Sequence, residues 1–180
     1  MRVITCQSYP FEATYESPAA AIAGGKNHKL QPKARADTKA LAGSRVIDAC
    51  WTANDFVLRF SNGKLLHVFL IGKRVAWETR DTPPDLEESD IERVGAEAVI
   101  CRWGPEVGDG IMDRSALIKA RCGKAFQMLY VNEGLSLYCE GMGILWFTAV
   151  RDVDTGRPFL YLSELEEPKR SASTKGAAPH

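Results

Sequence analysis

The chain of 180 residues lacks several features that would assign a function directly. Its odd number of cysteines, five, includes no CxxC pair and no spacing typical of zinc ligands. The 23 basic and 23 acidic side chains cancel, so no whole-protein charge favours nucleic acid or another highly charged partner. No apolar run approaches the ~20 residues that cross a bilayer, and residues 1–6 lack a signal-peptide core. These absences predict a cytoplasmic protein with reduced thiols and with no resident metal or cofactor.

The clearest positive signal is a β-hairpin over residues 55–71, centred on Asn62 and Gly63. Asn-Gly is the preferred pair for a two-residue type I′ turn, because both central positions need a positive φ. Such a loop pairs Phe60 with Leu65, and side-chain alternation then predicts one shared face of six residues: Phe56, Leu58, Phe60, Leu65, His67 and Phe69. The other face is also largely apolar, with Val57, Leu66, Val68 and Leu70. We therefore expect the hairpin to be covered on both sides.

The rest of the chain indicates an α+β fold, mainly antiparallel β-sheet with one or two short helices. We expect further strands at 46–52, 74–77, 98–103, 126–131 and 159–162, and a second hairpin from 135–139 and 144–150. Asp113 is a typical N-cap for a helix over 114–121, which Gly123 would end. A shorter helical turn is expected at 37–41, capped by Asp37, and a short acidic helix at about 89–94.

Composition changes at both ends of this expected domain, which we place at residues 37–167. Residues 1–36 are interpreted as a short edge strand followed by a flexible basic arm, because residues 12–36 contain almost no large apolar side chains. Residues 168–180 predict a disordered tail. Removal of the residues before Asp37 and after Glu167 should therefore cost little stability.

The two expected hairpins suggest an internal duplication, with 37–77 repeated in 113–162. At one offset Asp37 matches Asp113, and after a three-residue insertion Leu65 matches Ile144. Any two antiparallel hairpins share side-chain alternation, so common ancestry and coincidence are both open at this point.

The candidate catalytic residues are His67, Cys101, Cys139 and Asp154. On the apolar face predicted above, His67 is either a structural residue or a general base that works with a cysteine or a carboxylate. Asp154 begins Asp-Thr-Gly, the tripeptide of aspartic proteases, but a shared-proton dyad needs two copies of that loop. The same tripeptide is ordinary turn chemistry at a hairpin tip. A small hydrolase or transferase is therefore the enzymatic alternative.

The preferred hypothesis is a non-enzymatic interaction protein that binds another protein through a sheet or an acidic surface. The acidic surface comes from the segment between the hairpins and has five members: Asp85, Glu87, Glu88, Asp90 and Glu92. A third hypothesis is nucleic-acid binding by the basic arm at 26–35, which lacks interleaved aromatic side chains. No motif in the chain decides between these classes.

Overall fold

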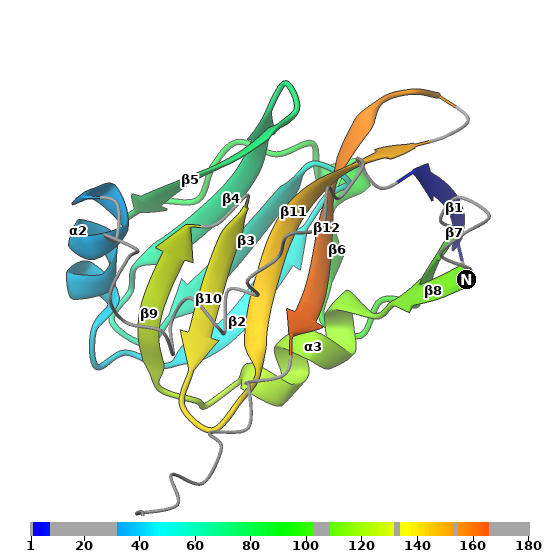
Figure 1. Ribbon diagram of the computed structural model, residues 1–180. Helices are drawn as coiled ribbons and strands as arrows, with labels where there is room; N and C mark the ends of the chain where they lie inside the picture. The colour runs from blue at the N-terminus through cyan, green and yellow to red at the C-terminus, as the bar shows by residue number, and fades with distance from the viewer. Residues whose placement is uncertain (1, 8–31, 103–108, 132–133, 153–154, 166–180) are drawn as a thin grey trace, which may run out of the picture.

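The computed structural model describes residues 2–7, 32–102, 109–131, 134–152 and 155–165. These residues form an α+β fold in which two mainly antiparallel sheets lie face to face, with two short α-helices beside them (Figure 1). The fold class is therefore the one that the sequence predicts. No helix in the described part of the chain is long and apolar enough to cross a membrane.

The first sheet has five strands in the order β5-β4-β3-β2-β6. Four consecutive strands form an antiparallel meander, and a two-residue strand adds to its edge: β2 (Val46–Trp51), β3 (Asp55–Phe60), β4 (Leu65–Ile71), β5 (Arg74–Arg80) and β6 (Glu92–Arg93). One face of this sheet packs on the second sheet, and we call the opposite face the outer face.

The second sheet is built around another four-stranded meander: β9 (Phe126–Val131), β10 (Leu135–Cys139), β11 (Ile144–Asp152) and β12 (Pro158–Leu165). Three short strands extend it beyond the end of β11: β1 (Arg2–Gln7), β7 (Val99–Arg102) and β8 (Asp109–Met112). β1 pairs with β7 on one side and with β11 on the other. It is therefore an interior strand, and the prediction of an edge strand is wrong.

Aromatic side chains join the two sheets. Phe56 of β3 meets Phe147 of β11 edge to face, with ring centroids 5.1 Å apart. Phe60 meets Phe126 of β9 in the same way at 5.6 Å. All four rings are buried, and each edge-to-face pair adds about 0.5–1.5 kcal/mol to the stabilisation from buried area.

The register of the central hairpin differs from the predicted register by one residue. Arg59, rather than Phe60, lies opposite Leu65. The loop contains three residues, 61–63, because the amide of Phe60 donates to the carbonyl of Lys64 at 2.9 Å. Gly63 takes the last loop position with a φ of 83°, as in three-residue hairpin loops that combine a type I turn with a bulge. The Asn-Gly pair thus marks the place of the turn but not its length.

A shift of one residue moves half of the predicted face to the other side of the sheet. Phe56, Leu58 and Phe60 face the core, as predicted. Leu65, His67 and Phe69 do not share that face; they lie on the outer face, in the rows of Arg59, Val57 and Asp55. The placement of His67 on the apolar core face is therefore wrong.

Each helix lies beside the sandwich and contacts both sheets, and the two helices lie at different sides (Figure 1). α2 (Pro32–Leu41) packs on β9, and its Asp37 carboxylate accepts hydrogen bonds from Trp77 Nε1 (2.8 Å) and Thr79 Oγ1 (2.9 Å) of β5. Asp37 is therefore a residue inside the helix rather than its cap. α2 also begins five residues before the expected domain boundary.

α3 (Arg114–Arg121) contacts β2 and β12, and its bounds are those predicted from the sequence. The predicted N-cap Asp113 accepts a hydrogen bond from the amide of Ala116 at 2.9 Å. The expected acidic helix at 89–94 is instead one 3₁₀ turn, η1 (Glu88–Asp90).

Both halves of the chain repeat one order of elements: a helix, a glycine with positive φ and a four-stranded meander. Gly43 (φ 75°) follows α2 and Gly123 (φ 81°) follows α3, and β2 and β9 begin three residues later. Equivalent positions of the two halves are therefore 80 residues apart in the structure. The predicted match of Asp37 with Asp113 implies a separation of 76 residues, which misaligns the two helices by about one turn. Common ancestry of the halves remains a prediction.

The two halves meet in a reciprocal pair of backbone hydrogen bonds. The amide of Val46 donates to the carbonyl of Lys124 (3.3 Å), and the amide of Phe126 donates to the carbonyl of Ser44 (2.8 Å). These bonds surround an antiparallel bridge between Arg45 and Ala125. The first strands of the two meanders are thus fixed to one another where both helices end.

Candidate binding groove

The outer face of the five-stranded sheet carries side chains that the pairing of strands brings into rows. One row crosses all five strands, from β6 to β5: Arg93, Cys50, Val57, His67 and Glu78. The next row contains Asp48, Arg59, Leu65 and Arg80. Directly opposite residues on one face have Cβ atoms about 5 Å apart, so neighbours in a row act on one another.

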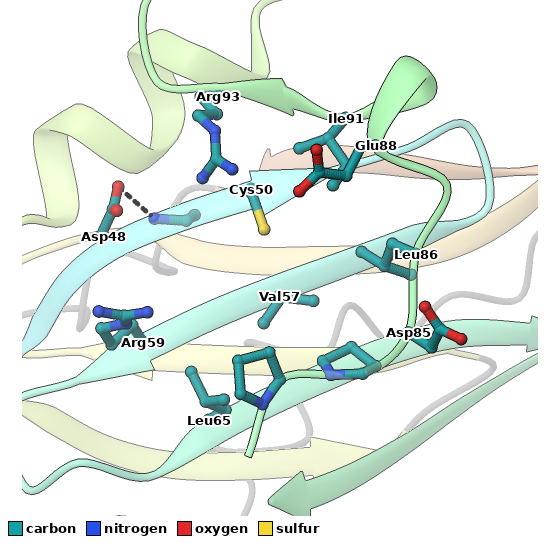
Figure 2. Close-up of a pocket in the computed structure, with 13 residues that line it drawn as sticks. Asp48, Cys50, Val57, Arg59, Leu65, Asp85, Leu86, Glu88, Ile91 and Arg93 are labelled. Carbon is teal, nitrogen blue, oxygen red and sulfur yellow. Dashed lines mark hydrogen bonds between the residues drawn. The ribbon is translucent and has the colours of Figure 1, made fainter. Parts of the chain in front are cut away.

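A connecting segment, residues 81–91, lies across this face, and we call it the strap (Figure 2). Pro83 and Pro84 end β5, because proline has no amide to donate to the sheet. Leu86 and Ile91 are half-buried, and the sheet residues opposite them, Val57 and Leu65, are buried although they face away from the core. The strap therefore gives the outer face a small apolar layer of its own.

A cavity of about 330 Å³ lies between the strap and the sheet, and we call it the groove. The sheet contributes six lining residues: Asp48, Ala49, Cys50, Val57, Arg59 and Leu65. The strap and β6 contribute the other seven: Pro83, Pro84, Asp85, Leu86, Glu88, Ile91 and Arg93. Its floor is apolar at the centre, and charged side chains stand around it (Figure 2).

Two arginines of the groove have no ionic partner within the described part of the chain. Arg59 and Arg93 are exposed, and neither guanidinium makes a hydrogen bond or ion pair with a described residue. Asp48 lies opposite Arg59 on the next strand, but its carboxylate accepts the amide of Ala49 at 2.8 Å (Figure 2). Two charged donors at the rim of the groove are therefore available to a ligand.

The pKa of the Cys50 thiol depends on the charged side chains around the floor of the groove. Burial raises the pKa of Cys50 above its ordinary value, while the guanidinium groups of Arg93 and Arg59 lower it and Asp48 raises it. Both arginines thus act on the same point of the floor. Since burial has the largest effect, the Cys50 thiol stays protonated at neutral pH and is a poor nucleophile.

His67 is held between two carboxylates. Its Nε2 lies 2.7 Å from Asp55 Oδ1, and its Nδ1 lies 3.0 Å from Glu78 Oε1. Arg80 also donates to Glu78 at 2.8 Å, and the hydrogen bonds from His67 and Arg80 lower the pKa of Glu78 below its ordinary value. The His67 side chain is only 9% exposed. Both ring nitrogens are engaged, which leaves neither to serve as a base for a substrate in this arrangement.

The structure does not bring the candidate cysteines to His67. Cys101 lies in β7 and Cys139 in β10, both in the second sheet and both fully buried. Burial raises the pKa of Cys139 to about 11, and Arg121 opposes the shift only in part. No described cysteine donates to His67, so the described residues assemble no thiol and base pair. Asp154 lies outside the described residues.

The five acidic residues proposed for binding separate into three groups. Asp85 and Glu88 line the groove. Glu87 and Asp90 are exposed on the strap and do not line it. Glu92 has a structural contact, because its carboxylate accepts the indole N–H of the buried Trp51 at 2.9 Å.

Sequence reasoning missed the other wall of the groove. Asp48, Cys50 and Arg59 come from β2 and β3, which the sequence predicts, but these residues were not recognised as part of a site; Arg93 comes from β6, which was not expected as a strand. The residues 26–31 of the basic arm lie outside the described residues, and of the remainder Arg35 is exposed on α2. Within the described residues, no group of three or more His, Cys, Asp or Glu side chains could hold a metal ion.

Comparison with known proteins adds no identification. No family model matches the chain, and neither a curated protein nor a solved structure is significantly similar to it.

Proposed function

We propose that the chain is a non-enzymatic interaction protein that binds a segment of another protein in the groove. The observation that carries this proposal is the cavity of about 330 Å³, with an apolar floor and two rim arginines that make no bond to a described residue. Burying apolar side chains supplies affinity, and charged groups at the rim supply specificity.

The size of the groove favours side chains of a partner over a large cofactor. Small-molecule sites in proteins are about 300–1,000 Å³, and the groove is at the lower end of that range. Half of its wall is an irregular strap with exposed carboxylates, and its charges are spread along its length. Such a surface suits a short peptide segment whose side chains alternate between apolar and polar.

The contacts of His67 and the cysteines favour binding over catalysis. Both nitrogens of His67 contact carboxylates, and the thiols of Cys50, Cys122 and Cys139 have raised pKa values. A cytoplasmic location is part of the same proposal, since Cys50, Cys122 and Cys139 are free thiols, as in a reducing compartment.

The proposal is tested with a library of random peptides displayed on phage and selected on the immobilised full-length chain. Peptides that bind at micromolar concentration should shift the backbone NMR signals of Val57, Arg59 and Leu86. Leu86→Glu should weaken the binding of these peptides, because it places a charge in the apolar layer. Ile71→Glu, at a residue that is 64% exposed on the tip of the β4–β5 hairpin, is the matched control. Peptides that bind elsewhere, or no binding peptides at all, would refute the proposal.

A further inference from the structure

We propose that the groove recognises a carboxylate of the partner segment, held by Arg59 and Arg93, beside an apolar side chain seated on Val57 and Leu65. This inference rests on the proposed function and states the chemistry of the partner. It concerns one acidic residue within an extended segment, rather than a polyanion.

The two guanidinium groups can converge on one point of the groove. Arg93 lies opposite Cys50 and Arg59 lies opposite Asp48, on the two strands that flank β2. Strand spacing and residue rise place their Cα atoms roughly 12 Å apart. An arginine side chain covers about half of that distance, so both groups can reach one point above Cys50. Figure 2 shows both side chains at the same end of the groove, on the two strands that flank the strand of Cys50.

The chemistry of the arginine side chain suits a carboxylate ligand. A guanidinium is always charged, and its planar set of N–H groups matches the two oxygens of a carboxylate. Neither guanidinium donates a hydrogen bond to a described residue. Both guanidinium groups lower the pKa of the Cys50 thiol against the effect of burial, so both positive charges act at the floor, where an incoming carboxylate would also meet them.

The carboxylates of the groove limit the ligand to one negative charge at this point. Asp85 and Glu88 line the wall formed by the strap, and Asp48 lies on β2, the strand between those of the two arginines. Three carboxylates against two guanidinium groups repel a nucleic acid or a run of acidic residues. A single carboxylate that binds the arginines is not repelled by the carboxylates of the strap.

The distance between the arginines and the apolar floor sets the spacing of side chains within the bound segment. Val57 is opposite Cys50 on the next strand, one strand spacing of about 5 Å away. Side chains on one side of an extended peptide repeat every two residues, about 7 Å. If the acidic residue of the segment has its carboxylate above Cys50, the residue two positions along the segment has its side chain above Val57 and Leu65. The expected pattern is an acidic residue and an aliphatic or aromatic residue separated by one position.

The test uses the groove-binding peptides selected on the full-length chain, made synthetically and labelled for fluorescence anisotropy. Their sequences should share one acidic residue two positions from an apolar residue. Arg59→Gln and Arg93→Gln should each weaken binding about tenfold, as the loss of a hydrogen bond to a charged group does. Arg74→Gln, an exposed arginine at the start of β5, changes the net charge equally and should leave binding unchanged.

A double-mutant cycle makes the test specific. Replacing the acidic residue of the peptide by its amide should cost the same tenfold, and should cost little more when Arg59 or Arg93 is already replaced. Unfolding curves of each variant confirm that the exposed substitutions leave the fold intact.

The outcomes separate the two proposals. Peptides that require Leu86 but contain no acidic residue, or that ignore both arginine variants, would overturn the carboxylate inference and leave the proposed function standing. Failure to select any groove-binding peptide would overturn both. Tighter binding of a single-stranded oligonucleotide than of the peptides, lost in the arginine variants, would also overturn the inference.

Discussion

Phe60 and Phe126 meet edge to face across the two sheets, with ring centroids 5.6 Å apart and planes at 86°. Phe60 ends β3 of the first meander, and Phe126 begins β9 of the second. The pair lies close to the bridge between Arg45 and Ala125, where the amide of Ser61 donates to the carbonyl of Arg45 at 2.8 Å. Side-chain packing and backbone pairing thus hold the two halves together at the same end of the sandwich.

Phe60→Ala should destabilise the protein by about 3–5 kcal/mol, because it removes a fully buried ring and leaves a cavity between the sheets. Denaturant unfolding measures the effect. Ile71→Ala, at an exposed position, is the control and should stay within about 0.5 kcal/mol. In a cycle with Phe126→Ala, we expect a coupling of about 0.5–1.5 kcal/mol beyond additivity. Strict additivity would mean that the two rings do not stabilise one another.

Glu78→Gln should lower stability at neutral pH, and the difference from the native chain should shrink in acid. The pKa of Glu78 is lowered from its ordinary value of 4.5 by the hydrogen bonds from His67 and Arg80. A carboxyl group whose pKa is lower in the folded state than in the unfolded state stabilises the native protein at pH values above its ordinary pKa. That stabilisation is lost as the pH falls through the lowered pKa. Thermal unfolding of both proteins from pH 7 to pH 3 measures it.

The control for this experiment is Glu87→Gln. Glu87 is exposed on the strap, and its carboxylate makes no hydrogen bond to a described residue. Its difference from the native chain should be small at every pH. A Glu78→Gln difference that stayed constant down to pH 3 would show that the carboxylate is not stabilised by its two donors.

Removal of residues 1–7 should destabilise the protein, contrary to the prediction from the sequence. β1 fills the position between β7 and β11, so its loss leaves both strands with unpaired backbone groups. Deletion of residues 168–180 is the comparison, and the composition of that segment predicts little loss. Calorimetric unfolding of both truncated chains decides the point. Equal melting temperatures for the two deletions would contradict the placement of β1.

Local signals predicted the elements well wherever a residue type determines the backbone. Asp113 as a cap and Gly123 as a terminator predicted α3 residue for residue. Pairing partners were harder, because they depend on loop length. Asn62 and Gly63 suit two kinds of hairpin loop, and the choice between them decides which face carries His67.

The groove has no local signal in the sequence. Its two walls come from residues 48–65 and 83–93, which the packing of Leu86 and Ile91 on the sheet and the pairing of β6 with β2 bring together. The carboxylates around His67 were missed because of the error in register, since Asp55 and Glu78 reach His67 from neighbouring strands once the register is correct. Two acidic members of the groove, Asp85 and Glu88, could be selected from charge alone.

The placement of the helices has a consequence for assembly of the chain. α2 belongs to the first half but packs on β9 of the second, and α3 belongs to the second half but packs on β2 of the first. Thr38 Oγ1 of α2 even accepts the amide of Leu129 in β9, at 3.1 Å. If the chain were cut after the strap, each fragment would hold the helix that the other needs. Two such fragments should gain structure only when mixed, with a rate that depends on their concentrations, as in the reassembly of a split protein.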